Sequence, residues 1–74
     1  MDYFERMRGL RQDHDLTQKQ IADKLGVAQN SYCQYESGLR SIPIEMLIKL
    51  CKFYDVSADY MLGISNIKNH YPKK

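Results

Sequence analysis

The sequence has little cysteine and no long apolar run, and each absence excludes a class of protein. Cys33 and Cys51 are the only cysteines in 74 residues, which is too few to predict the disulfide framework of a small secreted protein. No stretch reaches the roughly 18 apolar residues of a transmembrane helix. Residues 1–12 are charged throughout and lack an apolar core, so we expect no signal peptide. These absences predict a cytoplasmic protein without a membrane partner.

Patterns that carry metal or catalytic chemistry are also missing. Cys33, Cys51, His14 and His70 show no paired spacing of the kind that zinc ligands have. No nucleophile–base pair, paired carboxylate site or phosphate-binding glycine loop is apparent. We therefore expect no enzyme, no bound metal and no cofactor.

The excess of positive charge is small, with a formal net charge of +2. Residues 1–63 contain eight Lys and Arg against nine Asp and Glu, and the remaining basic residues are Lys68, Lys73 and Lys74. Strong nucleic-acid binders are often more basic. If the chain binds a nucleic acid, helix N-termini, side-chain amides and Arg40 would supply much of the phosphate contact, and so few cationic contacts predict a shallow salt dependence.

The most informative segment that is present spans residues 16–38. Thr17 and Gln20 form a capping-box pattern at the start of a helix, and Gly26 stands where a left-handed residue would end it. Gln29 begins a second helix, about 29–37, that Gly38 closes. The inward face of the first helix is formed by Ile21, Ala22 and Leu25. Two short helices with so short a connection predict a helix-turn-helix.

The outer face of the second helix carries side-chain amides. At about 100° per residue, one arc of roughly 140° holds Gln29, Asn30, Cys33, Gln34 and Ser37. The opposite side holds Ala28, Tyr32 and Tyr35, and we expect the two tyrosines to be buried. Amides of this kind often only solvate a surface helix. Behind a capped helix and a tight turn, however, they favour base reading in the DNA major groove, where an amide can pair with an adenine edge.

The remaining patterns predict three more helices and one compact core. The first runs from Tyr3 to about Asp13 after an Asp2 cap, with Phe4, Met7 and Leu10 turned inward. A fourth begins at Pro43, and a fifth begins after Ser57 and ends at Gly63. The predicted inward stripe of the fourth helix is Ile44, Leu47, Ile48, Leu50, Cys51 and Tyr54. We expect a single DNA-binding domain over residues 1–63 and an irregular basic tail over residues 64–74.

Residues 10–63 resemble, in a single register, the lambda-repressor-like (Cro/cI-type, XRE) helix-turn-helix family. The matching pieces are Leu10-Arg11, Leu16-Thr17-Gln18, Ile21-Ala22, Leu25-Gly26-Val27, Gln29, Tyr35-Glu36-Ser37-Gly38, Arg40, Pro43 and residues 56–63, VSADYMLG. The resemblance implies an all-α, compact five-helix domain with the helix-turn-helix at its second and third helices. It also implies sequence-specific binding to double-stranded DNA.

The resemblance implies roles for single residues as well. The base-reading positions correspond to Gln29, Asn30 and Gln34, with Ala28 at a position that contacts a thymine methyl group. Gln18 resembles the residue that holds a backbone phosphate and braces the first recognition residue, and Arg40 resembles a phosphate contact. Arg11 and Glu36 resemble a structural ion pair between the first and third helices. Ala28 departs from the family pattern, because Ser or Thr usually caps the recognition helix there.

The last expectation concerns self-association. A possible dimer face consists of Met46, Phe53, Tyr60, Met61, Ile64 and Ile67, although these side chains could instead complete a small core. A homodimer on DNA would recognise an inverted-repeat operator. We expect a transcriptional regulator that represses by occupying its operator. The alternative is a protein-interaction module, such as an antitoxin or anti-regulator, for which DNA binding is secondary.

Overall fold

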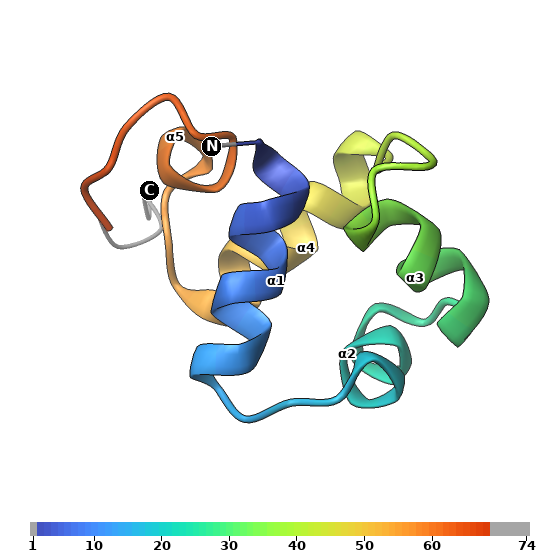
Figure 1. Cartoon of the computed structure of the whole chain (residues 1–74). Helices are drawn as coiled ribbons and strands as arrows, with labels where there is room; N and C mark the ends of the chain where they lie inside the picture. The colour runs from blue at the N-terminus through green and yellow to red at the C-terminus, as the bar shows by residue number, and fades with distance from the viewer. Residues whose placement is uncertain (1, 69–74) are drawn as a thin grey trace.

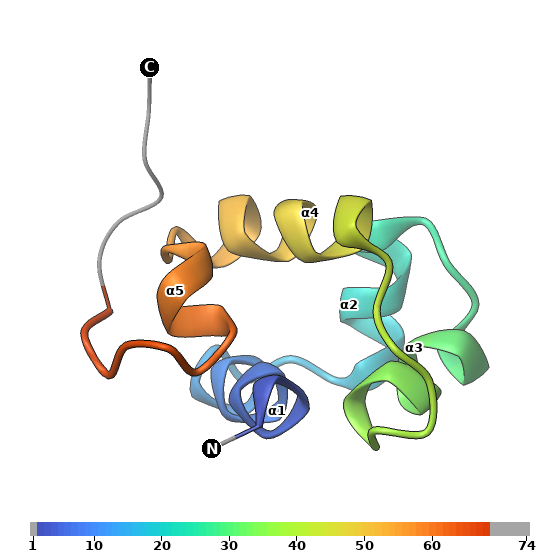
Figure 2. The ribbon, with the colours of Figure 1, turned by 90° about the horizontal axis from the view of Figure 1, so that it is seen from above.

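The structure is a computed structural model that describes residues 2–68. Over these residues the chain forms five helices and no strand, namely α1 (Tyr3–Asp13), α2 (Gln18–Leu25), α3 (Gln29–Glu36), α4 (Ile44–Tyr54) and α5 (Ala58–Met61). In Figure 1, α2 and α3 lie to one side of α1, and α5 lies to the other. The turned view in Figure 2 shows α4 across the core from α1 and α3. The predicted all-α architecture with five helices is confirmed.

Local capping chemistry sets the ends of the first two helices. At α2, the Thr17 hydroxyl accepts the backbone N–H of Gln20 at 3.1 Å, and the Gln20 side chain accepts the backbone N–H of Thr17 at 2.8 Å. Asp2 and Glu5 form the equivalent box at α1. Each box satisfies backbone donors that a helix start leaves unpaired. Both predicted N-termini are therefore correct.

The core receives side chains from every helix. Its buried apolar members are Met7, Leu10, Ile21, Ala22, Leu25, Tyr32, Tyr35, Leu47, Leu50, Cys51, Tyr54, Val56 and Met61. Met61 has no exposed surface, so its place on the possible dimer face is wrong. The four-residue helix α5 uses Met61 to close the core against α1 and α4.

The predicted inward stripe of α4 is too wide. Ile44 and Ile48 are 65% and 42% exposed, so their prediction as core residues is wrong. The buried side chains of α4 are Leu47, Leu50, Cys51 and Tyr54, which share an arc of about 100° at 100° per residue. Ile44 and Ile48 lie beyond one edge of this arc. Because the helix lies at the boundary of a small domain, only this narrow arc reaches the core.

Residues 64–68 are irregular and fastened to α1. The buried Arg6 guanidinium lies 4.1 Å from the centre of the Tyr60 ring, and its Nη2 donates to Asn66 Oδ1 at 3.3 Å. Lys68 Nζ lies 3.7 Å from Asp13 Oδ2. The first part of the predicted tail therefore packs on the domain. Residues 69–74, with His70, Lys73 and Lys74, lie outside the described residues.

Candidate nucleic-acid interface

The turn between α2 and α3 fixes the direction of α3 relative to α2. Gly26 adopts a left-handed conformation with φ of 74°, which glycine takes without the strain of a side chain. The backbone N–H of Val27 donates to the carbonyl of Ala22 at 3.0 Å. These features close α2 and direct residues 27–28 into α3 (Figure 1).

The outer side of α3 presents the predicted amides. Gln29 and Asn30 are exposed, and Gln34 is half-buried. Tyr32 and Tyr35 are buried, as predicted. The amide face is therefore turned to solvent while the aromatic face packs inward.

Ala28 does not share the buried side of α3 that its helical angle predicts. It is exposed, because it precedes the helix in an extended conformation with φ of −68° and ψ of 147°. Its side chain makes no capping bond. The methyl group is thus next to the amides, and the start of α3 lacks the usual side-chain acceptor.

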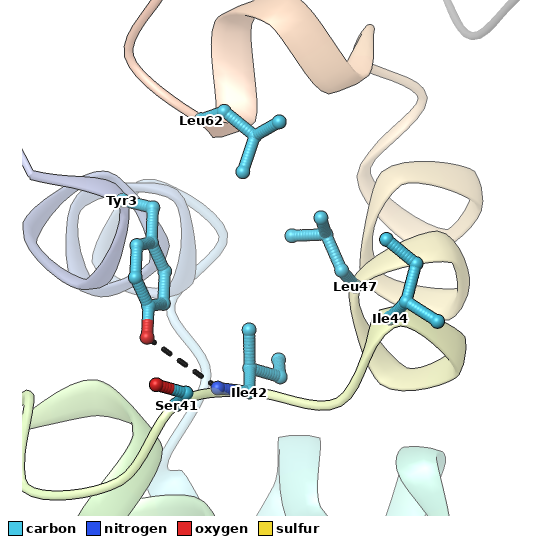
Figure 3. Close-up of a pocket in the computed structure, with 6 residues that line it drawn as sticks. All are labelled: Tyr3, Ser41, Ile42, Ile44, Leu47 and Leu62. Atoms are coloured by element: carbon cyan, nitrogen blue, oxygen red, sulfur yellow. Dashed lines mark hydrogen bonds between the residues drawn. The ribbon is translucent and has the colours of Figure 1, made fainter.

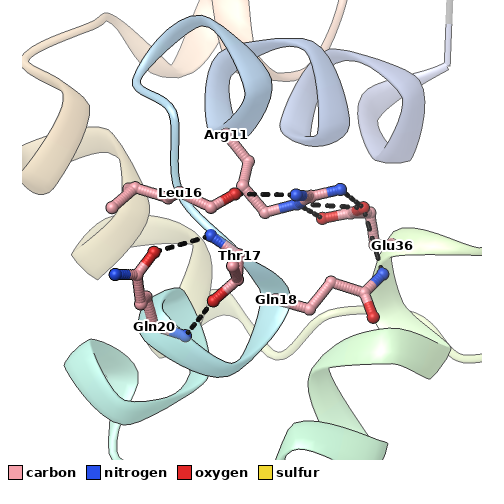
Figure 4. A network of polar contacts seen from close by, with 6 residues as sticks. All are labelled: Arg11, Leu16, Thr17, Gln18, Gln20 and Glu36. Atoms are coloured by element: carbon pink, nitrogen blue, oxygen red, sulfur yellow. Dashed lines mark hydrogen bonds and ion pairs between the residues drawn. The ribbon is translucent and has the colours of Figure 1, made fainter.

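The inner side of α3 is tied to α1 by an ion pair (Figure 4). Arg11 Nη2 donates to Glu36 Oε1 at 2.9 Å, and Arg11 Nε donates to Glu36 Oε2 at 2.9 Å. A further bond joins Arg11 Nη1 to the carbonyl of Leu16 at 2.8 Å. Arg11 therefore links the end of α3 to the residues that lead into α2, which fixes both helices of the motif on α1.

The Glu36 carboxylate is held in its charged form. Its side chain is only 3% exposed, and that of Arg11 is 14% exposed. Burial alone would raise the pKa of Glu36, but the hydrogen bonds from Arg11 and Gln18 outweigh it and lower that pKa. The pair is therefore ionised near neutral pH. Its bidentate geometry suits the planar guanidinium group.

Gln18 is the first residue of α2 and joins the same network. Its Nε2 donates to Glu36 Oε1 at 3.3 Å. The amide nitrogen has a second hydrogen, and the backbone N–H of Gln18 belongs to the first turn of the helix, where donors lack intrahelical partners. Gln18 thus has donors suited to an anion. Its bracing role toward Gln29 stays a prediction.

Arg40 lies in the exposed loop that follows α3. Its Nη1 donates to Gln34 Oε1 at 3.4 Å, and its guanidinium carbon lies 6.0 Å from the centre of the Tyr35 ring. The structure therefore brings Arg40 beside one of the predicted base-reading amides. No feature of the sequence pattern indicated this contact.

Five of the six side chains predicted for the dimer face have some exposed surface. Phe53, Ile64 and Ile67 are exposed. Met46 and Tyr60 are partly buried and pack against the core. Further exposed apolar residues were not predicted as surface, namely Leu39, Ile44, Ile48 and Leu62.

Two of these unpredicted residues border an apolar pocket (Figure 3). Its lining residues are Tyr3, Ser41, Ile42, Ile44, Leu47 and Leu62. The Tyr3 hydroxyl accepts the backbone N–H of Ile42 at 3.4 Å, which holds the loop before α4 against α1. The helical periodicity of α4 does not show that Ile44 lies at the edge of the buried face, because it does not tell how wide that face is.

The described residues show neither a membrane-spanning helix nor a cluster of metal ligands. No helix in residues 2–68 is long and apolar enough to cross a membrane. Within the same residues, no group of three His, Cys, Asp or Glu side chains is placed to hold a metal ion.

Comparison with known proteins agrees with this geometry. The helix-turn-helix family model matches residues 7–61. Three similar proteins are the uncharacterized HTH-type transcriptional regulator YobD of Bacillus subtilis, the cryptic phage CTXphi transcriptional repressor RstR of Vibrio cholerae and the antitoxin PezA of Streptococcus pneumoniae. Their identities to this chain are 44%, 41% and 33%. The fold and the α2–α3 unit define a lambda-repressor-like helix-turn-helix domain, and the chain belongs to the XRE-type helix-turn-helix family.

The matches cover most of this chain but only part of each relative. They include 86%, 73% and 85% of this chain, and 57%, 49% and 40% of YobD, RstR and PezA respectively. The chain therefore spans about half the length of the curated relatives it matches.

Proposed function

We propose that this chain is a non-enzymatic, sequence-specific regulator of transcription that binds double-stranded DNA in the cytoplasm. It represses by occupying an operator, with α3 in the major groove. The main support for this proposal is the difference between the two sides of α3. Its outer side presents the amides of Gln29, Asn30 and Gln34. Its inner side is held on α1 by the ion pair between Glu36 and Arg11. A rigidly held helix with outward amides suits base recognition.

Contacts with the DNA backbone would place the recognition helix. Gln18 offers a backbone N–H at the start of α2, and Arg40 offers an exposed guanidinium in the loop after α3. Both lie on segments that adjoin α3. Phosphate contacts on either side of a reading helix fix its position without reading sequence. Ala28, at the exposed start of α3, would contact a thymine methyl group.

A homodimer on an inverted repeat is the assembly we propose. Phe53, Ile64 and Ile67 provide exposed apolar surface for it, and Met46 and Tyr60 border that surface from the core. A two-fold dimer would place its two recognition helices about 34 Å apart, one turn of DNA. One domain alone would make few contacts with DNA, whereas a dimer would make twice as many.

Selection from random duplex DNA tests the proposed function. The wild-type chain should enrich an inverted repeat, and a Gln29→Ala/Asn30→Ala variant should lose preference at particular base pairs because it lacks the amide contacts. Lys24→Ala is a matched surface control that should enrich the same repeat. Failure of the wild-type chain to enrich any sequence would contradict the proposal.

The second candidate is a protein-interaction module for which DNA binding is secondary. It is favoured by the exposed apolar side chains and by the similarity to a protein named as an antitoxin. The same Gln29→Ala/Asn30→Ala variant separates the two functions. If the cellular phenotype persists in this variant while its melting temperature is unchanged, protein interaction is the main function.

A further inference from the structure

Gln34 of the recognition helix accepts several hydrogen bonds from the loop after α3. The main-chain carbonyl of Gln34 accepts the backbone N–H groups of Leu39 and Arg40 at 3.0 and 3.2 Å. It also accepts the Ser37 hydroxyl at 3.2 Å. Gly38, with φ of 82°, turns the chain back toward the helix. Arg40 is therefore held beside Gln34 by the backbone, before its side chain makes any contact.

The side chain of Arg40 then contacts the amide of Gln34. Nη1 of Arg40 lies 3.4 Å from Oε1 of Gln34. A guanidinium group can only donate, so the amide atom that faces it must be the oxygen. The amide nitrogen keeps both of its hydrogens for other acceptors. Of the five N–H groups of Arg40, one is used in this contact and others remain for a phosphate.

The contact changes what Gln34 can read. A glutamine recognises adenine by accepting from N6 and donating to N7, which needs both ends of its amide. The amide oxygen has a second lone pair, but the bond to Arg40 fixes its direction. The NH2 end of Gln34, with its two donors, is then the end that meets the base. Guanine presents two acceptors, N7 and O6, on its major-groove edge.

We infer that Arg40 is a positioning residue that orients the Gln34 amide so that this pair prefers guanine over adenine. The inference rests on the proposed function and specifies one of its contacts. A residue that only holds phosphate would instead contribute equally to every DNA sequence.

Binding-site selection from random duplex DNA, followed by affinity measurements on the selected duplex and its single-base variants, tests this role. The Gln34→Ala variant first identifies the base pair that Gln34 reads, as the one position where preference disappears. At that position the wild-type chain should prefer guanine. Arg40→Met keeps a long apolar stem over Tyr35 but removes the donors, and it should reduce the guanine-over-adenine ratio about tenfold.

Two controls separate positioning from loss of charge. Lys24→Met removes one positive charge from α2 and should leave the base ratio unchanged. The Gln34→Ala/Arg40→Met double variant should show the same base preferences as Gln34→Ala alone, because Arg40 acts through Gln34. Melting temperatures equal to wild type establish that the variants are folded, as expected for the exposed Arg40.

Two results would overturn the inference while leaving the proposed function intact. One is a wild-type preference for adenine at the Gln34 position. The other is an Arg40→Met variant that binds all duplexes more weakly by one common factor and keeps the guanine preference. If the wild-type chain selects no sequence at all, the proposed function fails and the inference fails with it.

Discussion

At the residue scale, the ion pair between Arg11 and Glu36 ties the end of α3 to α1. It joins α1 to the far end of α3 and lies almost entirely out of solvent. The exposed pair of Lys19 and Asp23 in α2 provides a natural comparison, with side chains 70% and 68% exposed and a separation of 3.4 Å. Exposed pairs contribute little to stability, whereas breaking a buried pair leaves an uncompensated charge.

The first prediction compares these two pairs by chemical denaturation. Glu36→Gln should lower the free energy of unfolding by about 3 kcal/mol, the low end for a broken buried pair, because Arg11 keeps slight exposure. Asp23→Asn should change it by less than about 0.5 kcal/mol. Equal effects of the two substitutions would show that the buried pair does not fix α3.

The pH dependence of the same variants gives a second check. The pKa of Glu36 is lowered in the folded chain. As pH falls, the Glu36 carboxylate therefore takes up a proton in the unfolded chain before it does so in the folded chain. Its stabilising contribution is present above the unfolded pKa of about 4.3 and is lost as pH falls through the folded pKa. Glu36→Gln should therefore have a shallower loss of stability below about pH 4.3 than the wild-type chain.

At the scale of elements, the helix starts were more predictable than the helix faces. Thr17 with Gln20 and Gly26 act through bonds and dihedral angles within a few residues, so the sequence alone places α2 correctly. The exposed edge of α4 at Ile44 and Ile48 depends on how much of the helix the rest of the domain covers. The contact between Arg40 and Gln34 depends on the path of a loop, which no periodic pattern records.

Gly26 in the turn of the helix-turn-helix and Gly38 at its end should respond differently to alanine. Gly26 and Gly38 both have positive φ, and a Cβ at Gly26 would meet nothing within 4 Å. Gly26→Ala should therefore lose only about 1–2 kcal/mol of stability from the left-handed conformation. Gly38→Ala should lose more, because its Cβ would lie 3.0 Å from the Phe4 ring. Thermal unfolding of both variants measures the difference, and an equal loss would contradict the close packing of Phe4.

At the scale of the whole molecule, the family and the fold were predictable, but the outer surface was only partly so. The amide positions and the buried tyrosines of α3 follow from helical angles over a short element. The burial of Met61 does not, because it depends on α5 packing against α1 and α4. The attachment of residues 64–68 to α1 through Arg6 also depends on residues far apart in sequence.

The proposed dimer makes a prediction about stoichiometry on DNA. Ile64→Asp places a charge in the proposed dimer face and should reduce the complex from two chains per duplex to one, because burying an unpaired charge is costly. Ile48→Asp, on an exposed edge of α4 outside that face, is the matched control and should keep two chains. Native mass spectrometry of the complexes with the selected duplex counts the chains. Two chains with Ile64→Asp would place the interface elsewhere.

We propose above all that the outer face of α3 reads DNA bases with its side-chain amides. The most direct test is to follow the side-chain amide resonances of this chain by nuclear magnetic resonance while the selected duplex is added. We expect the amide resonances of Gln29, Asn30 and Gln34 to shift strongly, while that of Gln12, exposed on α1, stays in place. A shift of the Asn66 side-chain amide, beyond α5, with the three α3 amides unmoved would contradict this proposal.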